Sequence, residues 1–395
     1  MMATDNKDKE VLNVPHLRFP EFSGEWKKCK FGEIATGFDY GMNAAAKPFD
    51  GENKYIRITD IDEASSTYND TDIVSPDGTL TDNYVVNDRD ILLARTGAST
   101  GKSYLYRKSD GKLYYAGFLI RANVTEHNPY FVFSQLHTHR YWRWVSIMSA
   151  RSGQPGINSQ EYSSFPIFTT SLQEENKIST LLSLLDERIA TQTKVIEKLE
   201  SLINGLVDTM ILRKPQNAII GDVCSISKQI RAEAKIDDII TVRLHGNGVC
   251  KSNAESLQLG STQYYRRNAG QLIYGKQNFH NGAIGIVPMT LDKGITSKDI
   301  PSFDIDNSKC NSVYLLAQLL SPKFYKPSEA LTTGTGSKRL KEETFLRMPI
   351  VLPDKEEQDN IAVLIDKITM RLDQAKRMLN LFSAQKQYLL CQMFI

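Results

Sequence analysis

Residues 178–210 read ISTLLSLLDERIATQTKVIEKLESLINGLVDTM, and this stretch decides the fold. Its apolar side chains recur at alternating steps of four and three residues. This is the heptad spacing of a helix that offers a narrow seam to a partner helix. Gln192 is a polar interruption of that seam. The apolar seam residues are Ile178, Leu182, Leu185, Ile189, Ile196, Leu199, Ile203, Leu206 and Met210.

Signals at both ends predict a helix over residues 171–214. Ser171 and Glu174 have the spacing of a capping box, and Pro215 stops the helix. About 40 residues at about 1.5 Å each give a rod of roughly 60 Å. The alternative interpretation is a long core helix of a single globular domain.

The same pattern returns at the C-terminus, over residues 353–395. Its seam residues each lie 183 positions after a residue of the first seam: Ile361, Ile365, Ile368, Leu372, Ala375, Leu379, Phe382, Lys386, Leu389 and Met393. Asp354 and Glu357 repeat the capping box at the same offset. Two rods with complementary seams in one chain should pair with each other.

The repeat also covers the segments between the rods. At the offset of 183, the matched pairs are Pro166 with Pro349, Ile167 with Ile350, Gly153 with Gly336, Tyr141 with Phe324 and Gln135 with Gln318. The chain therefore reads as globule, rod, globule, rod, in two related halves of about 180 residues.

Composition is compatible with two ordinary domains and sets few further limits. The chain has 395 residues, 41% of them hydrophobic, and a net charge of +2, so any anion-binding face must be local. Its five cysteines have no paired or metal-ligand spacing, which suits a reducing cytosol. No apolar run reaches membrane-spanning length, so we expect a cytoplasmic protein without a membrane partner.

Both globules should be α+β. Residues 1–13 read as a flexible tail, 14–170 as the first globule and 215–352 as the second. Short β-type runs dominate both globules, with helices expected over Pro129–Met148 and near Asn311–Leu320. Asp110-Gly111 is a hairpin signal between two strands. In the first helix, Tyr141, Trp142 and Trp144 are expected to pack into the core.

Catalytic motifs are matched only loosely. Thr96–Ser103 resembles a phosphate-binding loop, but Thr96 replaces the first glycine and the residues that follow read as strand rather than helix. Asn128–Phe131 lacks the second proline of the adenine-methyltransferase motif, and Pro76-Asp77 with Asp110–Lys112 only loosely matches a nuclease pattern. We therefore expect a chain with no catalytic residues and no metal site of its own.

Loops at equivalent places of the two halves carry polar and basic side chains. Arg95 and Lys102 flank one loop of the first half, and Lys276 and Asn278 occupy its counterpart, while loop 152–158 corresponds to loop 335–341. Side chains of these types match base edges and phosphates in donor geometry. The alternative is an ordinary solvated loop. The candidate contact residues are Arg57, Arg95, Lys102, Gln154, Asn158, Arg243, His245, Lys276, Asn278, Lys338 and Arg339.

This layout resembles the specificity subunit of type I DNA restriction-modification enzymes. Segments similar to that family's recurring ones are Leu17–Phe22, Phe165–Ile167, Met348–Ile350 and the helix openings Glu174–Ile178 and Glu356–Ile361. Glu175 stands where the family usually has Gln, and Asn360 where it usually has Lys.

The resemblance implies a division of labour. Each globule would be a target recognition domain that reads one half of an asymmetric, split site in the major groove of double-stranded DNA. The antiparallel rods, related by a pseudo-twofold, would set the spacer and dock methyltransferase subunits. Two adenine methyltransferase subunits would use S-adenosylmethionine, and two translocase-nuclease subunits would use ATP and Mg. This chain would bind no cofactor.

Two other classes of protein fit the sequence less well. One is a coiled-coil scaffold whose globules bind proteins. The other is an enzyme with an unrecognised site. Basic clusters on the same face of both globules would favour DNA over the scaffold, and a carboxylate cluster in a deep pocket would favour an enzyme.

Overall fold

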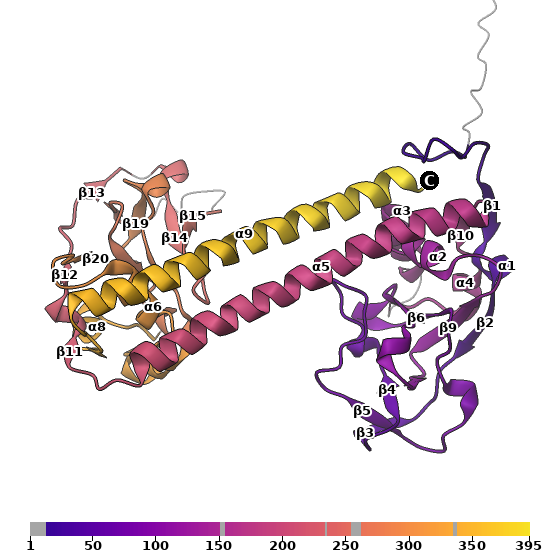
Figure 1. The fold of residues 1–395 in the computed structure, drawn as a ribbon, viewed down its shortest axis with the longest axis horizontal. Helices are drawn as coiled ribbons and strands as arrows, with labels where there is room; N and C mark the ends of the chain where they lie inside the picture. The colour runs from indigo at the N-terminus through magenta and orange to yellow at the C-terminus, as the bar shows by residue number, and fades with distance from the viewer. Residues whose placement is uncertain (1–12, 151–154, 234, 254–261, 335–337) are drawn as a thin grey trace, which may run out of the picture. The chain divides into compact units, whose positions relative to one another are not determined.

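The computed structural model describes residues 13–395 except 151–154, 234, 254–261 and 335–337. The chain forms two compact units: residues 1–191 with 379–395 make unit 1, and residues 192–378 make unit 2. Each unit combines an α+β globule with a stretch of both long helices, α5 (Leu172–Val207) and α9 (Lys355–Met393) (Figure 1).

Unit 1 is built on a four-stranded antiparallel sheet. Its strands, in spatial order, are β2 (Ala35–Tyr40), β9 (Leu119–Val124), β6 (Asp90–Ala94) and β7 (Ser103–Leu105). Alternate residues of a strand face opposite sides, so Ile91 and Leu93 pack with the helices while Leu92 packs on the other side. The helices of the globule are α1 (Phe31–Ile34), α2 (Pro129–Gln135), α3 (His139–Ser149) and α4 (Ser159–Ser163).

Three two-stranded pairings complete unit 1. They join β1 (Lys27–Lys30) to β10 (Pro166–Thr169), β3 (Ala45–Pro48) to β5 (Val74–Asp77), and β4 (Lys54–Ile56) to β8 (Leu113–Tyr115). The β4–β8 pair is parallel and covers the face of the main sheet that the helices leave free.

Unit 2 repeats this plan. Its four-stranded sheet has the order β12 (Cys224–Ile226), β20 (Ser302–Ile305), β17 (Leu272–Tyr274) and β18 (Ile284–Ile286). Its helices are α6 (Ser312–Leu319), α7 (Pro322–Tyr325) and α8 (Glu342–Leu346). The remaining strands are β11 (Ala218–Ile219), β13 (Arg231–Ala232), β14 (Ile240–Val242), β15 (Val249–Lys251), β16 (Tyr264–Arg266), β19 (Ile295–Ser297) and β21 (Pro349–Ile350).

Matched side chains perform matched tasks in the two units. Gln135 accepts a hydrogen bond from the Phe168 amide (2.9 Å) and donates one to the Phe168 carbonyl oxygen (2.7 Å). Gln318 makes the same two bonds to Val351, at 2.8 and 3.3 Å. Because a buried backbone needs both its donor and its acceptor satisfied, these glutamines fix α2 to β10 in unit 1 and α6 to the residue that follows β21 in unit 2.

The seams are buried within each unit. In unit 1, Ile178, Leu182 and Leu185 of α5 share a core cluster with Leu389 and Met393 of α9. In unit 2, where the two helices run antiparallel, Val207 and Ile211 share one with Ile361 and Ile365. Each apolar residue predicted for helix pairing is buried or partly buried, including Ile189, Ile196, Leu199, Ile203, Leu206, Ile368, Leu372, Leu379 and Phe382.

At the N-terminus of each long helix, one of the two bonds of the predicted capping box is present. The Glu174 amide donates to Ser171 Oγ at 3.3 Å, and the Glu357 amide donates to Asp354 Oδ1 at 2.8 Å. The C-terminal end of the first rod is less regular than expected, because residues Asp208–Leu212 form a π-helical turn before Pro215.

Three local predictions were wrong. The helix expected over Pro129–Met148 is split into α2 and α3, because Thr138 caps a new helix by accepting from the Tyr141 amide. Asp110-Gly111 does form a turn, but the flanking strands β7 and β8 pair with β6 and β4 rather than with each other. Trp142 is 43% exposed, whereas Tyr141 is fully buried and Trp144 packs against the core.

None of the helices within the described ranges is long and apolar enough to cross a membrane.

Candidate nucleic-acid interface

In unit 1, four chain segments meet at one corner of the main sheet. These are the ends of β2 and β6, the turn before β9, and the loop before α4. Arg95 links them: its amide donates to the Phe118 carbonyl oxygen at 3.0 Å, and its own carbonyl accepts from the Ile157 amide at 2.9 Å. The Ser159 amide donates to the Tyr40 hydroxyl at 3.2 Å. We call Tyr40, Arg95, Phe118, Asn158 and Ser159 the unit 1 corner.

The unit 1 corner presents a cation and two aromatic rings. The Arg95 guanidinium lies 4.6 Å from the centre of the Tyr40 ring, and no described carboxylate forms an ion pair with it. Tyr40 is 43% exposed and Phe118 57%. A guanidinium stacked on an aromatic face keeps its N–H groups in plane and available to a ligand.

The other residues predicted to contact DNA in this region differ in their interactions. Lys102 lies 3.2 Å from the exposed carboxylate of Glu63. Asn158 caps α4, because its side-chain oxygen accepts from the Glu161 amide at 2.9 Å. Gln154 lies outside the described residues.

The equivalent corner of unit 2 has the same backbone plan. The Lys276 amide donates to the Asp299 carbonyl oxygen, and the Leu340 amide donates to the Lys276 carbonyl oxygen, both at 2.9 Å. Lys276 therefore occupies the place of Arg95, and Asp299 the place of Phe118. We call Lys276, Asp299, Arg339 and Glu342 the unit 2 corner.

Carboxylates accompany the cations of the unit 2 corner. Lys276 Nζ lies 2.8 Å from Glu342, and Arg339 lies 3.4 Å from Asp299. This corner thus presents donors and acceptors side by side, whereas the described part of the unit 1 corner presents a cation with aromatic rings. The two corners are equivalent in position and different in chemistry.

A second group of predicted residues in unit 2 comes together on two adjoining loops. The His245 amide donates to the Asn281 carbonyl oxygen at 2.8 Å, which brings Arg243 and His245 close to Asn278. The loops approach closely because Gly282 has φ +72° and a Cβ there would meet His245 Cα at 3.3 Å. All three predicted side chains are exposed.

Two predicted residues are tied to neighbouring carboxylates elsewhere. Arg57 makes two hydrogen bonds of 2.8 Å to Asp60, and these raise the pKa of the arginine. Its guanidinium therefore pairs with a carboxylate three residues away and does not belong to the unit 1 corner. Lys338 lies 3.2 Å from Glu329.

Sequence reasoning missed Tyr40, Phe118, Asp299 and Glu342. A search for basic and amide side chains in loops does not select aromatic or acidic residues. A usable signal was present for Phe118, because Ala116-Gly117-Phe118 places a large apolar residue directly after a turn glycine.

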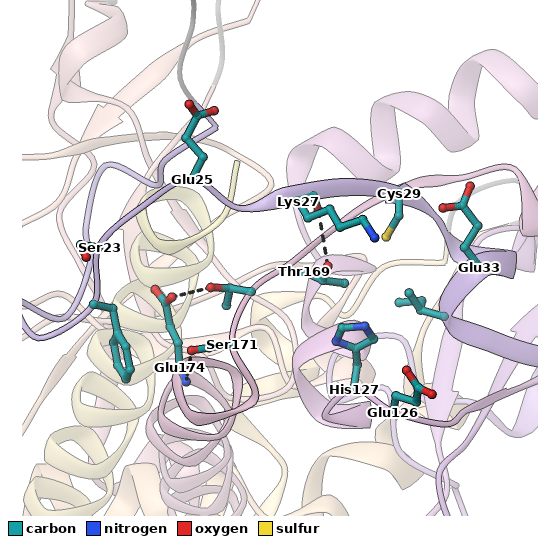
Figure 2. A pocket seen from close by; sticks show the side chains of 13 residues that line it. Ser23, Glu25, Lys27, Cys29, Glu33, Glu126, His127, Thr169, Ser171 and Glu174 are labelled. Atoms are coloured by element: carbon teal, nitrogen blue, oxygen red, sulfur yellow. Dashed lines mark hydrogen bonds between the residues drawn. The ribbon is translucent and has the colours of Figure 1, made fainter.

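A cavity in unit 1 bears on the enzyme alternative. It measures about 520 Å³ and is lined by residues that include Glu25, Glu33, Glu126 and Glu174 (Figure 2). Burial raises the pKa of Glu174, but hydrogen bonds from Arg18 and Thr170 outweigh it and hold the pKa below its usual value. The Glu174 carboxylate also accepts from the Thr170 hydroxyl at 2.6 Å, so it anchors the segment that leads into α5. Within the described ranges, no three His, Cys, Asp or Glu side chains are placed to hold a metal ion.

The two units are thus related α+β globules, each with a polar corner and a stretch of both long helices. Residues 23–201 match the family model described as Type I restriction modification DNA specificity domain. This match identifies residues 23–201 as a DNA specificity domain of the type I restriction-modification class.

A solved structure shows the same fold. The S subunit of a type I restriction-modification system from M. genitalium has a TM-score of 0.67 at 13% identity, with 97% of this chain and 99% of that chain covered. The HsdS subunit from Thermoanaerobacter tengcongensis has 14% identity over 93% of this chain and 96% of that one, with a TM-score of 0.37. No curated protein is significantly similar to the chain.

Proposed function

We propose that each unit of this chain reads one half of an asymmetric, bipartite DNA site through its corner. The observation that carries the proposal is the equivalence of the corners in backbone plan and their difference in side chains. Arginine and lysine donate to guanine, and carboxylates accept from the cytosine amino group. Two corners with different donors and acceptors should therefore select different half-sites.

The experiment is selection of random DNA duplexes by the full-length chain. The proposal expects an enriched motif of two short, unlike half-sites separated by a fixed, unspecified spacer. Arg95→Ala should relax one half-site, and Lys276→Ala the other. The scaffold alternative expects no enriched motif, and that result would contradict the proposal.

The outward face of α9 supports docking of a methyltransferase subunit. Leu364 and Met370 are 39% and 65% exposed, and they line a shallow cavity of about 730 Å³ together with Lys367 and Arg371. Exposed apolar side chains rimmed by charges are typical of protein-binding surfaces. Met370→Glu should reduce retention of the methyltransferase subunit on the tagged chain and leave DNA binding unchanged. Glu356→Gln, on the same helix, is the control.

Chemistry would belong to the partner subunits. The proposal places S-adenosylmethionine on the methyltransferase subunits, and ATP and Mg on the translocase subunits, with two copies of each partner per complex. The purified chain should transfer no methyl groups and cut no DNA, and it should direct methylation only after its partners are added. Stoichiometric methyl transfer by the chain alone would contradict this division.

A further inference from the structure

Phe118 is a solvent-exposed apolar side chain on a rigid backbone turn. It is 57% exposed and belongs to the turn from Ala116 to Leu119. Exposure of such a ring has no benefit for folding, because burial of an aromatic side chain is favourable. An exposed ring held at a fixed position is available to a ligand.

The turn that carries Phe118 is fixed on both sides. The Leu119 amide closes it by donating to the Ala116 carbonyl oxygen at 2.8 Å, and the Gly117 amide donates to the Met42 carbonyl oxygen at 2.8 Å. In the residue that follows β2, a Cβ at Gly41 would lie 2.3 Å from the Ala116 carbonyl oxygen. The backbones are in such close contact that the turn has little room to move and bury the ring.

The surroundings of Phe118 identify the chemistry of that ligand. Arg95 lies beside Phe118, because its amide donates a backbone hydrogen bond to the Phe118 carbonyl oxygen. Its guanidinium lies over the Tyr40 ring and forms no ion pair with a described carboxylate. A ligand for this corner therefore offers an acceptor or an anionic group next to an apolar one. The edges of DNA bases in the major groove combine both, because guanine presents acceptors and thymine presents a C5-methyl group.

In unit 2, the position equivalent to Phe118 carries an acidic residue instead of an aromatic ring. Asp299 takes the place of Phe118 there and contacts Arg339 at 3.4 Å. The same backbone position thus carries an apolar group in one unit and an acceptor in the other. This is the pattern expected of a position that selects a base rather than one that supports the fold.

We propose that Phe118 is a specificity-determining residue that packs on the C5-methyl group of a thymine in the half-site read by unit 1. The inference rests on the proposed function, since it assigns one base contact within the same corner. Phe118 makes the apolar contact, and Arg95 contacts a neighbouring base or phosphate.

The test removes the methyl group from the DNA. The probe is the duplex selected by the full-length chain, with each thymine of both half-sites replaced in turn by deoxyuridine, and the measurement is the dissociation constant. At one thymine, the replacement should weaken binding by the wild-type chain about fourfold, the effect of one buried methyl group. Phe118→Ala should bind the thymine and deoxyuridine duplexes equally, and Phe118→Leu should retain part of the discrimination.

The matched control is Ile147→Ala. Ile147 is 58% exposed on α3, an element that contributes no residue to the unit 1 corner, so the variant should discriminate like the wild type. The inference is overturned if no thymine shows a methyl effect, or if Phe118→Ala weakens binding to both duplexes by the same factor, as a wedge between bases would. A wild-type chain that selects no sequence at all would contradict the proposed function itself, and the thymine contact with it.

Discussion

The side chain of Gln192 donates a hydrogen bond from Nε2 to the main-chain oxygen of Ala375 at 3.2 Å. The two residues are 183 positions apart (375 − 192), which is the offset of the internal repeat, so each is the other's equivalent. In an antiparallel pair of equivalent helices, a residue meets its own counterpart only near the centre of the pair. Within unit 2, the polar interruption in the seam of α5 therefore sets the register of the two helices.

The Gln192 contact predicts opposite effects of two substitutions. Gln192→Leu should keep or raise the unfolding temperature, because an apolar residue fits the seam. Gln192→Glu should lower the free energy of unfolding by about 1–3 kcal/mol, because a carboxylate cannot donate to the Ala375 oxygen and repels it. Thermal and urea unfolding of both variants provide the measurement. Equal stability of the two variants would show that the hydrogen bond does not contribute.

Arg95 should contribute to sequence preference. If its guanidinium contacts a base, Arg95→Ala weakens specific binding by about 1–3 kcal/mol and relaxes one half-site. Arg95→Lys should recover only part of this, because an ammonium group lacks the paired donors. Lys108→Ala is the control, since Lys108 is 82% exposed and outside the corner. A uniform loss across sequences, with a smaller salt dependence, would reassign Arg95 to a phosphate.

Lys338 and Arg339 should behave similarly in unit 2. Their joint replacement by Ala should weaken binding by about 1–3 kcal/mol if either makes a paired base contact. Because Arg339 lies beside Asp299, Asp299→Asn should alter the preference at the same position of the motif. Unchanged motifs in both variants would place the reading surface of unit 2 elsewhere, with Arg243, His245 and Asn278 as the next candidates.

His137 makes the stability of unit 1 dependent on pH. Burial and the nearby charge of Lys386 lower the pKa of His137 to about 4, although Asp186 opposes them. The folded state thus holds the neutral ring, and the stabilisation is complete above the unfolded pKa of about 6.5. As the pH falls from about 6.5 towards 4, unit 1 should lose up to about 3 kcal/mol.

Urea unfolding of the wild type and His137→Gln across this pH range measures the effect. The glutamine variant should show a flatter dependence, because it cannot take up the proton. Identical pH profiles for the two chains would contradict the assignment to His137.

The long helices and the repeat were predictable because their signals are local or periodic. Caps, heptads and an offset of 183 can be read directly from the chain, and matches such as Gln135 with Gln318 proved to make the same hydrogen bonds. The corners were predictable only in part. Arg95 and Lys276 were found as polar residues after strands, but Tyr40 and Phe118 reach Arg95 through pairings between distant segments that no local pattern reveals.

The wrong predictions have similar causes. Trp142 was assigned to the core because it lies in a predicted helix, although its place on α3 exposes it. The Asp60 partner of Arg57 was likewise not visible in the sequence, and the predicted DNA contact of Arg57 stays a prediction.

The helices should act as the ruler between half-sites. Seven residues inserted into each helix at matched places preserve the seam and lengthen it by about 10 Å. That length corresponds to about three base pairs, which also rotate the second half-site by about 100°. Methylation by the complete complex should weaken and shift to sites with longer spacers. Two inserted residues should instead disrupt the seam, and full activity at the original spacer after the seven-residue insertion would exclude the ruler.

The central claim is that the two units read DNA independently. The most direct measurement replaces residues 27–165 by the equivalent globule of a relative and determines the methylated motif by sequencing the modified adenines made by the reconstituted complex. The account predicts that one half-site changes while the other half-site and the spacer stay the same. A motif in which both half-sites change together, or neither changes, would contradict it.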